Sequence, residues 1–255
     1  MNALARRGVF ASILLGASML GGCFTFGDAR QPIAMQLVPA PAQGAPTAAV
    51  VVLPGFGVDA ADMRAHGIDA AVQKSWPHAD VLLTDATFAY YPSGKLVGRL
   101  ETDVMGPVEA RYKQVYLVGA SMGGMGALLY ERAHPGQTAG LLLFAPFLGD
   151  GEMLDEIRKV GGVKQWNPGP VPAEVNGDNY QHEIWRTIKS WSEDPARAQR
   201  IWLVCGEDDH LLEAVRLAAQ ALPASHFVEV KGGHSWKAWA ASAQQVLAQI
   251  RNGQS

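Results

Sequence analysis

Short, continuous runs of apolar residues recur along the chain from residue 49 and alternate with segments of helical periodicity. The runs lie at residues 49–53, 80–84, 115–119, 141–145, 201–205 and 226–230. Most of them do not alternate apolar with polar side chains, which favours strands that are buried on both faces of a parallel sheet. The pattern therefore predicts an α/β domain with a mostly parallel, doubly wound sheet.

The segments between these runs predict the helices that connect the strands. Apolar residues recur at helical spacing in residues 60–75, 122–133, 211–222 and 235–251, and residues 94–112 are less regular and contain Pro107. The segment 122–133 is followed by Pro135-Gly136, which is a stop signal for a helix.

Residues 146–200 interrupt this alternation and predict a lid-like insert before the strand expected at residues 201–205. The segment is rich in proline, predicts only short helices at residues 155–160 and 181–190, and is longer than an ordinary loop. It carries Trp166, Trp185 and Trp191. These tryptophans either pack the insert onto the body or line a substrate pocket.

The amino terminus has the features of a bacterial export signal. Arg6 and Arg7 precede fifteen uncharged residues, 8–22, which are too few for a typical membrane-spanning helix. Leu20-Gly21-Gly22-Cys23 resembles the lipobox of bacterial lipoproteins. The alternatives are an ordinary signal peptide with an accidental cysteine, or a buried helix.

The lipoprotein resemblance implies three parts and a location. Residues 1–22 would be a signal peptide, residues 23–49 a tether lipidated at Cys23, and residues 50–255 the catalytic domain. Acyl chains on Cys23 would hold the protein at a membrane of the cell envelope. Phe24, rather than an aspartate, follows the cysteine and favours the outer membrane, facing the periplasm or the cell surface.

A motif of the form G-x-S-x-G stands where the third of these strands meets a helix. It reads Gly119-Ala120-Ser121-Met122-Gly123. A sharp strand-to-helix turn leaves no room for side chains two residues before and after the serine, and glycine avoids the clash. In this context the chain resembles the α/β-hydrolase family over most of residues 49–251. The resemblance implies that Ser121 is a catalytic nucleophile.

The same resemblance implies an acid and a histidine that follow the serine in the chain. The loop after residues 201–205 carries Asp209 at the family's usual position for the acid, with Asp208 as a turn-capping neighbour and Asp150 as a lesser alternative. Gly232-Gly233-His234 precedes the last helix and matches the family's catalytic histidine. The remaining histidines are expected on the surface or in the core: His66, His78, His134, His182, His210 and His226.

The glycine-rich turn Pro54-Gly55-Phe56-Gly57 after the first run predicts part of an oxyanion hole. The backbone amide of Met122 would be one donor and that of Phe56 the other, with Gly57 as the alternative to Phe56. Proline stands at position 54 and alanine at position 120, where the family often has histidine. Neither of those family side chains takes part in the chemistry.

Together these features predict a serine carboxylester hydrolase that acts on a small ester or a lipid-like substrate without a metal or organic cofactor. An acyltransferase, a peptidase or a non-catalytic binding module on the same fold are the alternatives. The net charge of −3 gives no basic excess for nucleic acid. Besides Cys23 the chain has only Cys205, whose apolar flanks predict a buried strand position.

Overall fold

The computed structural model describes residues 26–253, and in it the apolar runs form one seven-stranded sheet. The order is β1-β3-β2-β4-β5-β6-β7. Every neighbouring pair is parallel except β1 with β3. The strands are Met35–Val38 (β1), Ala48–Leu53 (β2), Ala79–Thr84 (β3), Val115–Ala120 (β4), Gly140–Phe144 (β5), Ile201–Gly206 (β6) and Phe227–Val230 (β7). The predicted mostly parallel sheet is confirmed.

The central strands are buried on both faces, as their continuous apolar sequences predict. All six residues of β2, of β3, of β4 and of β6 are buried. Strand β1 adds an antiparallel edge and lies in the part of the sequence expected to be a tether. It pairs Met35 with Thr84 and Val38 with Val81.

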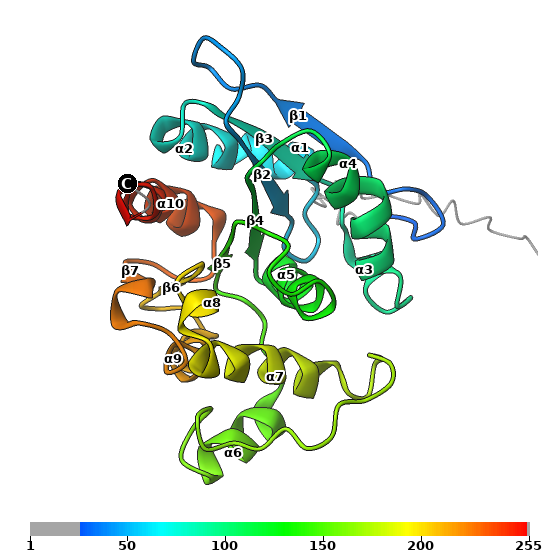
Figure 1. Cartoon of the computed structure of the whole chain (residues 1–255), viewed down its shortest axis with the longest axis vertical. Coiled ribbons are helices and arrows are strands. Elements are labelled where there is room, and N and C mark those ends of the chain that lie inside the picture. Colours follow the sequence, from blue (N-terminus) through cyan, green and yellow to red (C-terminus); the bar gives the residue numbers. More distant parts are fainter. Residues whose placement is uncertain (1–25, 254–255) are drawn as a thin grey trace, which may run out of the picture.

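Helices cover both faces of the sheet (Figure 1). Helices α2 (Ile68–Ser75) and α10 (Trp236–Gly253) lie side by side on one face, where Trp76 Nε1 donates to the carbonyl of Leu247 at 3.0 Å. On the other face α5 (Met122–Ala133) packs against β4 and contacts α3 (Leu96–Arg99) and α7 (Tyr180–Glu193). Helix α9 (Leu212–Ala219) packs against β6. Among residues 26–253, no helix is long and apolar enough to cross a membrane.

Two expected helices are divided in the structure. Residues 60–75 form α1 (Ala60–Ala65) and α2, which are separated at Gly67 with a φ of 75°. Residues 94–112 form α3, a π-helical turn at Leu100–Met105 and α4 (Gly106–Glu109) in one run. Pro107 lies directly after the π-helical turn, so the hydrogen bond that its missing amide cannot donate falls where the helix is already irregular.

The insert 146–200 contains α6 (Gly151–Lys159), α7 and α8 (Pro195–Ala198). Trp166, Trp185 and Trp191 are each at most 2% exposed, so they pack the insert rather than line an open pocket. An ion pair also fastens α7 to α5, because Glu183, 1% exposed, accepts from Arg132 at 2.8 Å.

Candidate active site

The loops at the carboxyl ends of the parallel strands lie along one edge of the sheet, and the predicted site residues are in them. Backbone hydrogen bonds connect these strand ends in sequence. Ser121 donates to the carbonyl of Phe144 at 2.9 Å, and Ala145 donates to that of Val204 at 2.7 Å. The loop after β6 is bonded to the loop after β7, because Asp208 donates to Gly232 at 3.0 Å. The backbones that carry the predicted site are therefore tied together.

Ser121 stands on a strained turn between β4 and α5. Its φ is 53° and its ψ −117°, a conformation that non-glycine residues rarely adopt and that concentrates at functional sites. Close backbone packing holds the turn. A Cβ added at Gly119 would overlap the carbonyl of Gly123, and one added at Gly123 would overlap the carbonyls of Leu53 and Pro54. The predicted reason for both motif glycines is thus present in the structure.

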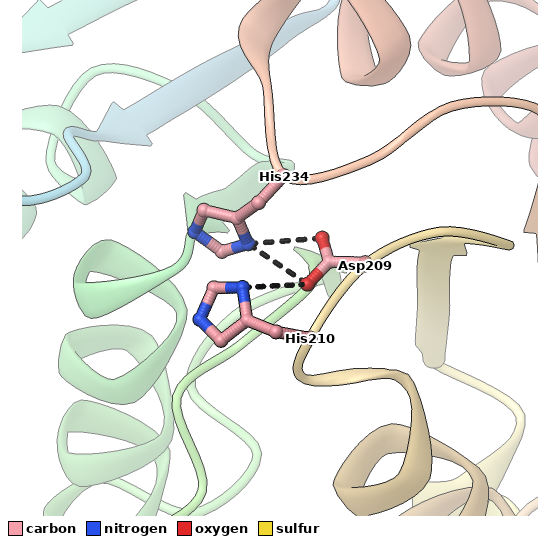
Figure 2. A group of neighbouring side chains, drawn as sticks. All are labelled: Asp209, His210 and His234. Atoms are coloured by element: carbon pink, nitrogen blue, oxygen red, sulfur yellow. Dashed lines mark hydrogen bonds and ion pairs between the residues drawn. The ribbon is translucent and has the colours of Figure 1, made fainter.

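Asp209 is the carboxylate that the structure brings to His234. His234 Nδ1 lies 2.9 Å from Asp209 Oδ2 and 3.0 Å from Oδ1 (Figure 2). The side chain of Asp209 is fully buried, and its Oδ1 also accepts from the backbone amide of Leu211 at 2.9 Å. These donors compensate for the burial of the charge.

The two other aspartates considered for this position lie elsewhere. Asp208 is exposed. Asp150 is also exposed and caps helix α6, where it accepts from the amide of Met153 at 3.1 Å. The structure therefore separates the three candidates by burial and by partner.

The imidazole of His234 is held between its carboxylate and an aromatic ring. Trp239 lies edge-on to it, with ring centroids 4.8 Å apart, and is 3% exposed. Among the described residues no hydrogen bond joins His234 to Ser121. Catalytic hydrogen bonds are often long in the free enzyme and tighten when the substrate binds.

The backbone segments that carry the predicted oxyanion donors lie next to Ser121. Met122 is the first residue of α5, so helical geometry gives its amide no acceptor within the helix. The loop that carries Phe56 runs past the serine, because a Cβ added at Gly55 would lie 3.7 Å from Ser121 Cβ. The site is thus built from the ends of β2, β4, β6 and β7.

Two features of this edge were not predicted from the sequence. His210, expected only on the surface or in the core, places Nδ1 3.6 Å from Asp209 Oδ1. Phe26, Phe56 and Phe88 form a cluster of edge-to-face rings, with centroids 5.9 Å apart between Phe26 and Phe56 and 5.2 Å between Phe56 and Phe88. The position of His210 directly after the acid was the available signal, whereas the phenylalanines are remote in sequence.

Cys205 does not take part in this arrangement as a nucleophile. It is fully buried in β6, as predicted. Burial, followed by the negative charge of Asp209, raises the pKa of its thiol to about 12. A thiol with so high a pKa is inert at neutral pH.

The sequence matches the Esterase family over residues 95–250, more than half of the chain. The chain belongs to the Esterase family. The matched segment includes Ser121, Asp209 and His234. Membership in this family supports a carboxylester hydrolase, as the sequence predicts. No curated protein matches the sequence.

Solved structures with the same fold include several hydrolases. A ferulic acid esterase is 17% identical, with a TM-score of 0.59, and the match covers 89% of this chain and 96% of that one. An S-formylglutathione hydrolase from Staphylococcus aureus is 13% identical, with a TM-score of 0.57 and coverages of 85% and 89%. A monoacylglycerol lipase from Paleococcus ferrophilus is 16% identical, with a TM-score of 0.55 and coverages of 86% and 100%. At these identities the likeness establishes the fold.

Proposed function

We propose that this esterase cleaves carboxylic esters through an acyl-enzyme on Ser121, with His234 as general base and Asp209 as the group that orients it. The observation that carries the proposal is the hydrogen-bonded pair of the buried Asp209 and His234, at the edge where the strained turn presents Ser121. Because Asp209 receives Nδ1–H, Nε2 of His234 is left as the acceptor for a proton.

In the first half of the reaction Ser121 Oγ attacks the ester carbonyl while its proton passes to His234 Nε2. The tetrahedral intermediate collapses, the C–O bond to the alcohol breaks, and His234 returns the proton to the leaving oxygen. In the second half a water molecule repeats these steps on the acyl-enzyme and releases the acid. Asp209 stabilises the imidazolium that forms in each half.

The negative oxygen of the intermediate would be bound by the backbone amides of Met122 and Phe56. The amino end of α5 adds the favourable field of the helix dipole. Each donor of this kind contributes about 3 kcal/mol to transition-state binding in serine hydrolases.

The cluster of Phe26, Phe56 and Phe88 supports a preference for esters with an apolar or aromatic group. Phe56 is 49% exposed and Phe26 is 50% exposed, next to the loop that passes Ser121. A structural neighbour, Est1E from Butyrivibrio proteoclasticus, has been solved with ferulic acid bound, and its TM-score to this chain is 0.54. An aryl or acyl group resting on Phe56 would place the ester carbonyl near the serine. In Phe56→Ala, kcat/KM for esters of aromatic or long-chain acids should fall more than kcat/KM for an ester of acetic acid.

We further propose that Cys23 is lipidated and that the enzyme works at a membrane of the bacterial cell envelope, the outer one rather than the inner. Residues 1–25 lie outside the described part of the structure, and the proposal is supported by the lipobox-like sequence before Cys23. Labelling cells with a palmitate analogue should mark the wild type and not Cys23→Ser. Equal labelling of the two proteins would contradict lipidation.

A serine-reactive fluorophosphonate probe tests the catalytic proposal directly. The folded wild type should be labelled, and Ser121→Ala should not. Ser93→Ala, which changes an exposed serine, is the control and should be labelled like the wild type. Failure of the folded wild type to react would contradict the proposed nucleophile.

A further inference from the structure

His210 brings a second imidazole to the carboxylate that holds the catalytic histidine. Its Nδ1 lies 3.6 Å from Asp209 Oδ1, and its ring centroid lies 4.7 Å from that of His234. Figure 2 shows a ring nitrogen of each histidine turned toward the same carboxylate. The proposed ester hydrolysis uses only one of these two histidines.

The donor set of Asp209, His210 and His234 is one that zinc and related divalent ions prefer. Two imidazole nitrogens and one carboxylate oxygen suit Zn²⁺ and bind Mg²⁺ or Ca²⁺ poorly. One ligand atom from each residue lies within 4.8 Å of the other two. No ion is present in the structure.

The spacing of these atoms is close to that of a zinc site. Bonds of about 2.0–2.2 Å in a tetrahedron place neighbouring ligand atoms roughly 3.3–3.5 Å apart. Asp209 Oδ1 lies 3.0 Å from His234 Nδ1 and 3.6 Å from His210 Nδ1. These two distances lie on either side of the required value. Small movements of the two rings would therefore complete the three-ligand set.

The three side chains differ in exposure in a way that favours capture of an ion from solvent. The side chain of Asp209 is fully buried, and the amide of Leu211 holds its Oδ1. The side chain of His234 is 25% exposed, whereas that of His210 is 70% exposed. Solvent can thus reach the site past His210, while Asp209 keeps its position.

We propose that Asp209, His210 and His234 bind Zn²⁺ or a similar divalent transition-metal ion, and that this ion inhibits the enzyme reversibly. The metal takes the place of the proton on His234 Nδ1, and that proton moves to Nε2. No electron is transferred and no proton leaves the ring. A protonated Nε2 has no lone pair for the proton of Ser121, so nucleophilic attack is blocked. Water would fill the fourth coordination position. The inhibitory half of this inference rests on the proposed function, whereas the binding half does not.

The first experiment measures inhibition. The full-length protein is treated with EDTA, and hydrolysis of p-nitrophenyl acetate is followed against buffered free Zn²⁺, with Mg²⁺ as the control ion. Zn²⁺ should inhibit, EDTA should restore the rate, and Mg²⁺ should have no effect.

In His210→Gln the half-inhibitory concentration of Zn²⁺, with each rate taken relative to that variant's own uninhibited rate, should rise by about tenfold or more. His182→Gln removes another histidine that is partly exposed and paired with an acid, and it should keep the wild-type sensitivity. Equal sensitivity of His210→Gln and the wild type would overturn the proposal.

The second experiment measures binding without activity. Ser121→Ala cannot turn over but keeps the three ligands, so competition with a chromophoric zinc chelator should detect one tight site per chain. Adding His210→Gln to that variant should weaken the site by about tenfold or more. Absence of a site in Ser121→Ala overturns the inference. Zinc binding by a wild type that does not hydrolyse esters overturns the proposed function alone. Zinc binding without inhibition of an active enzyme overturns the inhibitory half.

Discussion

Two aspartates at opposite edges of the sheet are almost equally buried, yet they have different partners. Asp80, at the amino end of β3, is 4% exposed and accepts from the hydroxyl of Tyr112 at 2.5 Å and the amide of Ala40 at 2.7 Å. Asp209, beyond the carboxyl end of β6, is 5% exposed and faces His234. Burial and hydrogen bonding alone therefore do not distinguish a catalytic carboxylate. The histidine partner is what sets Asp209 apart from Asp80.

The two edges also differ in backbone strain. The non-glycine residues with positive φ in the described part of the chain are Ser121 at 53° and Ala145 at 40°, at the ends of adjacent strands β4 and β5. Both lie at the carboxyl edge, and Ala145 donates to the carbonyl of Val204 at 2.7 Å. Strain of this kind persists only where the surrounding structure holds it, and it collects at active sites.

The largest effect should come from the serine at the carboxyl edge. Ser121→Ala should lower kcat by about 10⁵-fold or more, as removal of the nucleophile does in other serine hydrolases. Ala145 shows that an alanine can hold a positive φ in this protein, so the turn at position 121 should tolerate an alanine. Steady-state rates and thermal unfolding would be measured together. Substantial activity in a folded variant would contradict the role of Ser121.

The next change compares the two aspartates directly. Asp209→Asn should lower kcat by about 10⁴-fold, because an amide in place of the carboxylate favours the wrong tautomer of His234. Asp80→Asn is the matched variant, and it should keep the wild-type kcat because Asp80 contacts no proposed catalytic group. Similar losses of kcat in both variants would mean that burial, rather than the histidine partner, sets the role of these carboxylates.

A smaller effect, on stability, should mark the amino edge. Tyr112→Phe leaves Asp80 with one donor fewer and should lower the free energy of unfolding by about 1–3 kcal/mol. The kcat should stay at the wild-type value. Urea denaturation and ester hydrolysis would be measured on the same preparation. An activity loss in a stable Tyr112→Phe protein would show that the two edges are coupled.

The smallest effect is a dependence of stability on alkaline pH. Burial, then the hydrogen bond to Asp80, raises the pKa of Tyr112 to about 12. Because the pKa is raised in the folded state, the contribution of Tyr112 to the free energy of unfolding is complete below the unfolded-state pKa near 10. This contribution is lost as the pH rises toward 12. Tyr91, whose hydroxyl is buried, and the buried Tyr130 also have raised pKa values and act in the same direction. Unfolding measured from pH 9 to 12 should therefore show a steep loss in the wild type and a shallower one in Tyr112→Phe. Identical pH dependences of stability in the two proteins would mean that Tyr112 does not contribute to the loss.

Much of the fold was predictable because its signals are local. The predicted ranges of β2 to β7 differ from the observed ones by at most one residue at either end, and α5 matches residues 122–133. Local signals did not predict a helix break at a glycine or the pairing of segments that are distant in the sequence. Gly67 divides the helix expected at residues 60–75, and the pairing of β1 with β3 depends on residues far apart in the sequence.

The sequence by itself determined the parallel sheet, the strained turn at Ser121 and the order of serine, acid and histidine. Apolar run length, turn glycines and motif spacing act within a few residues, so they can be interpreted without coordinates. Only the tertiary structure decided that Asp209 rather than Asp208 meets His234, that His210 shares its carboxylate, and that Phe26 contacts Phe56. Those contacts depend on where the loops after separate strands converge, and that convergence is set by the packing of the whole sheet.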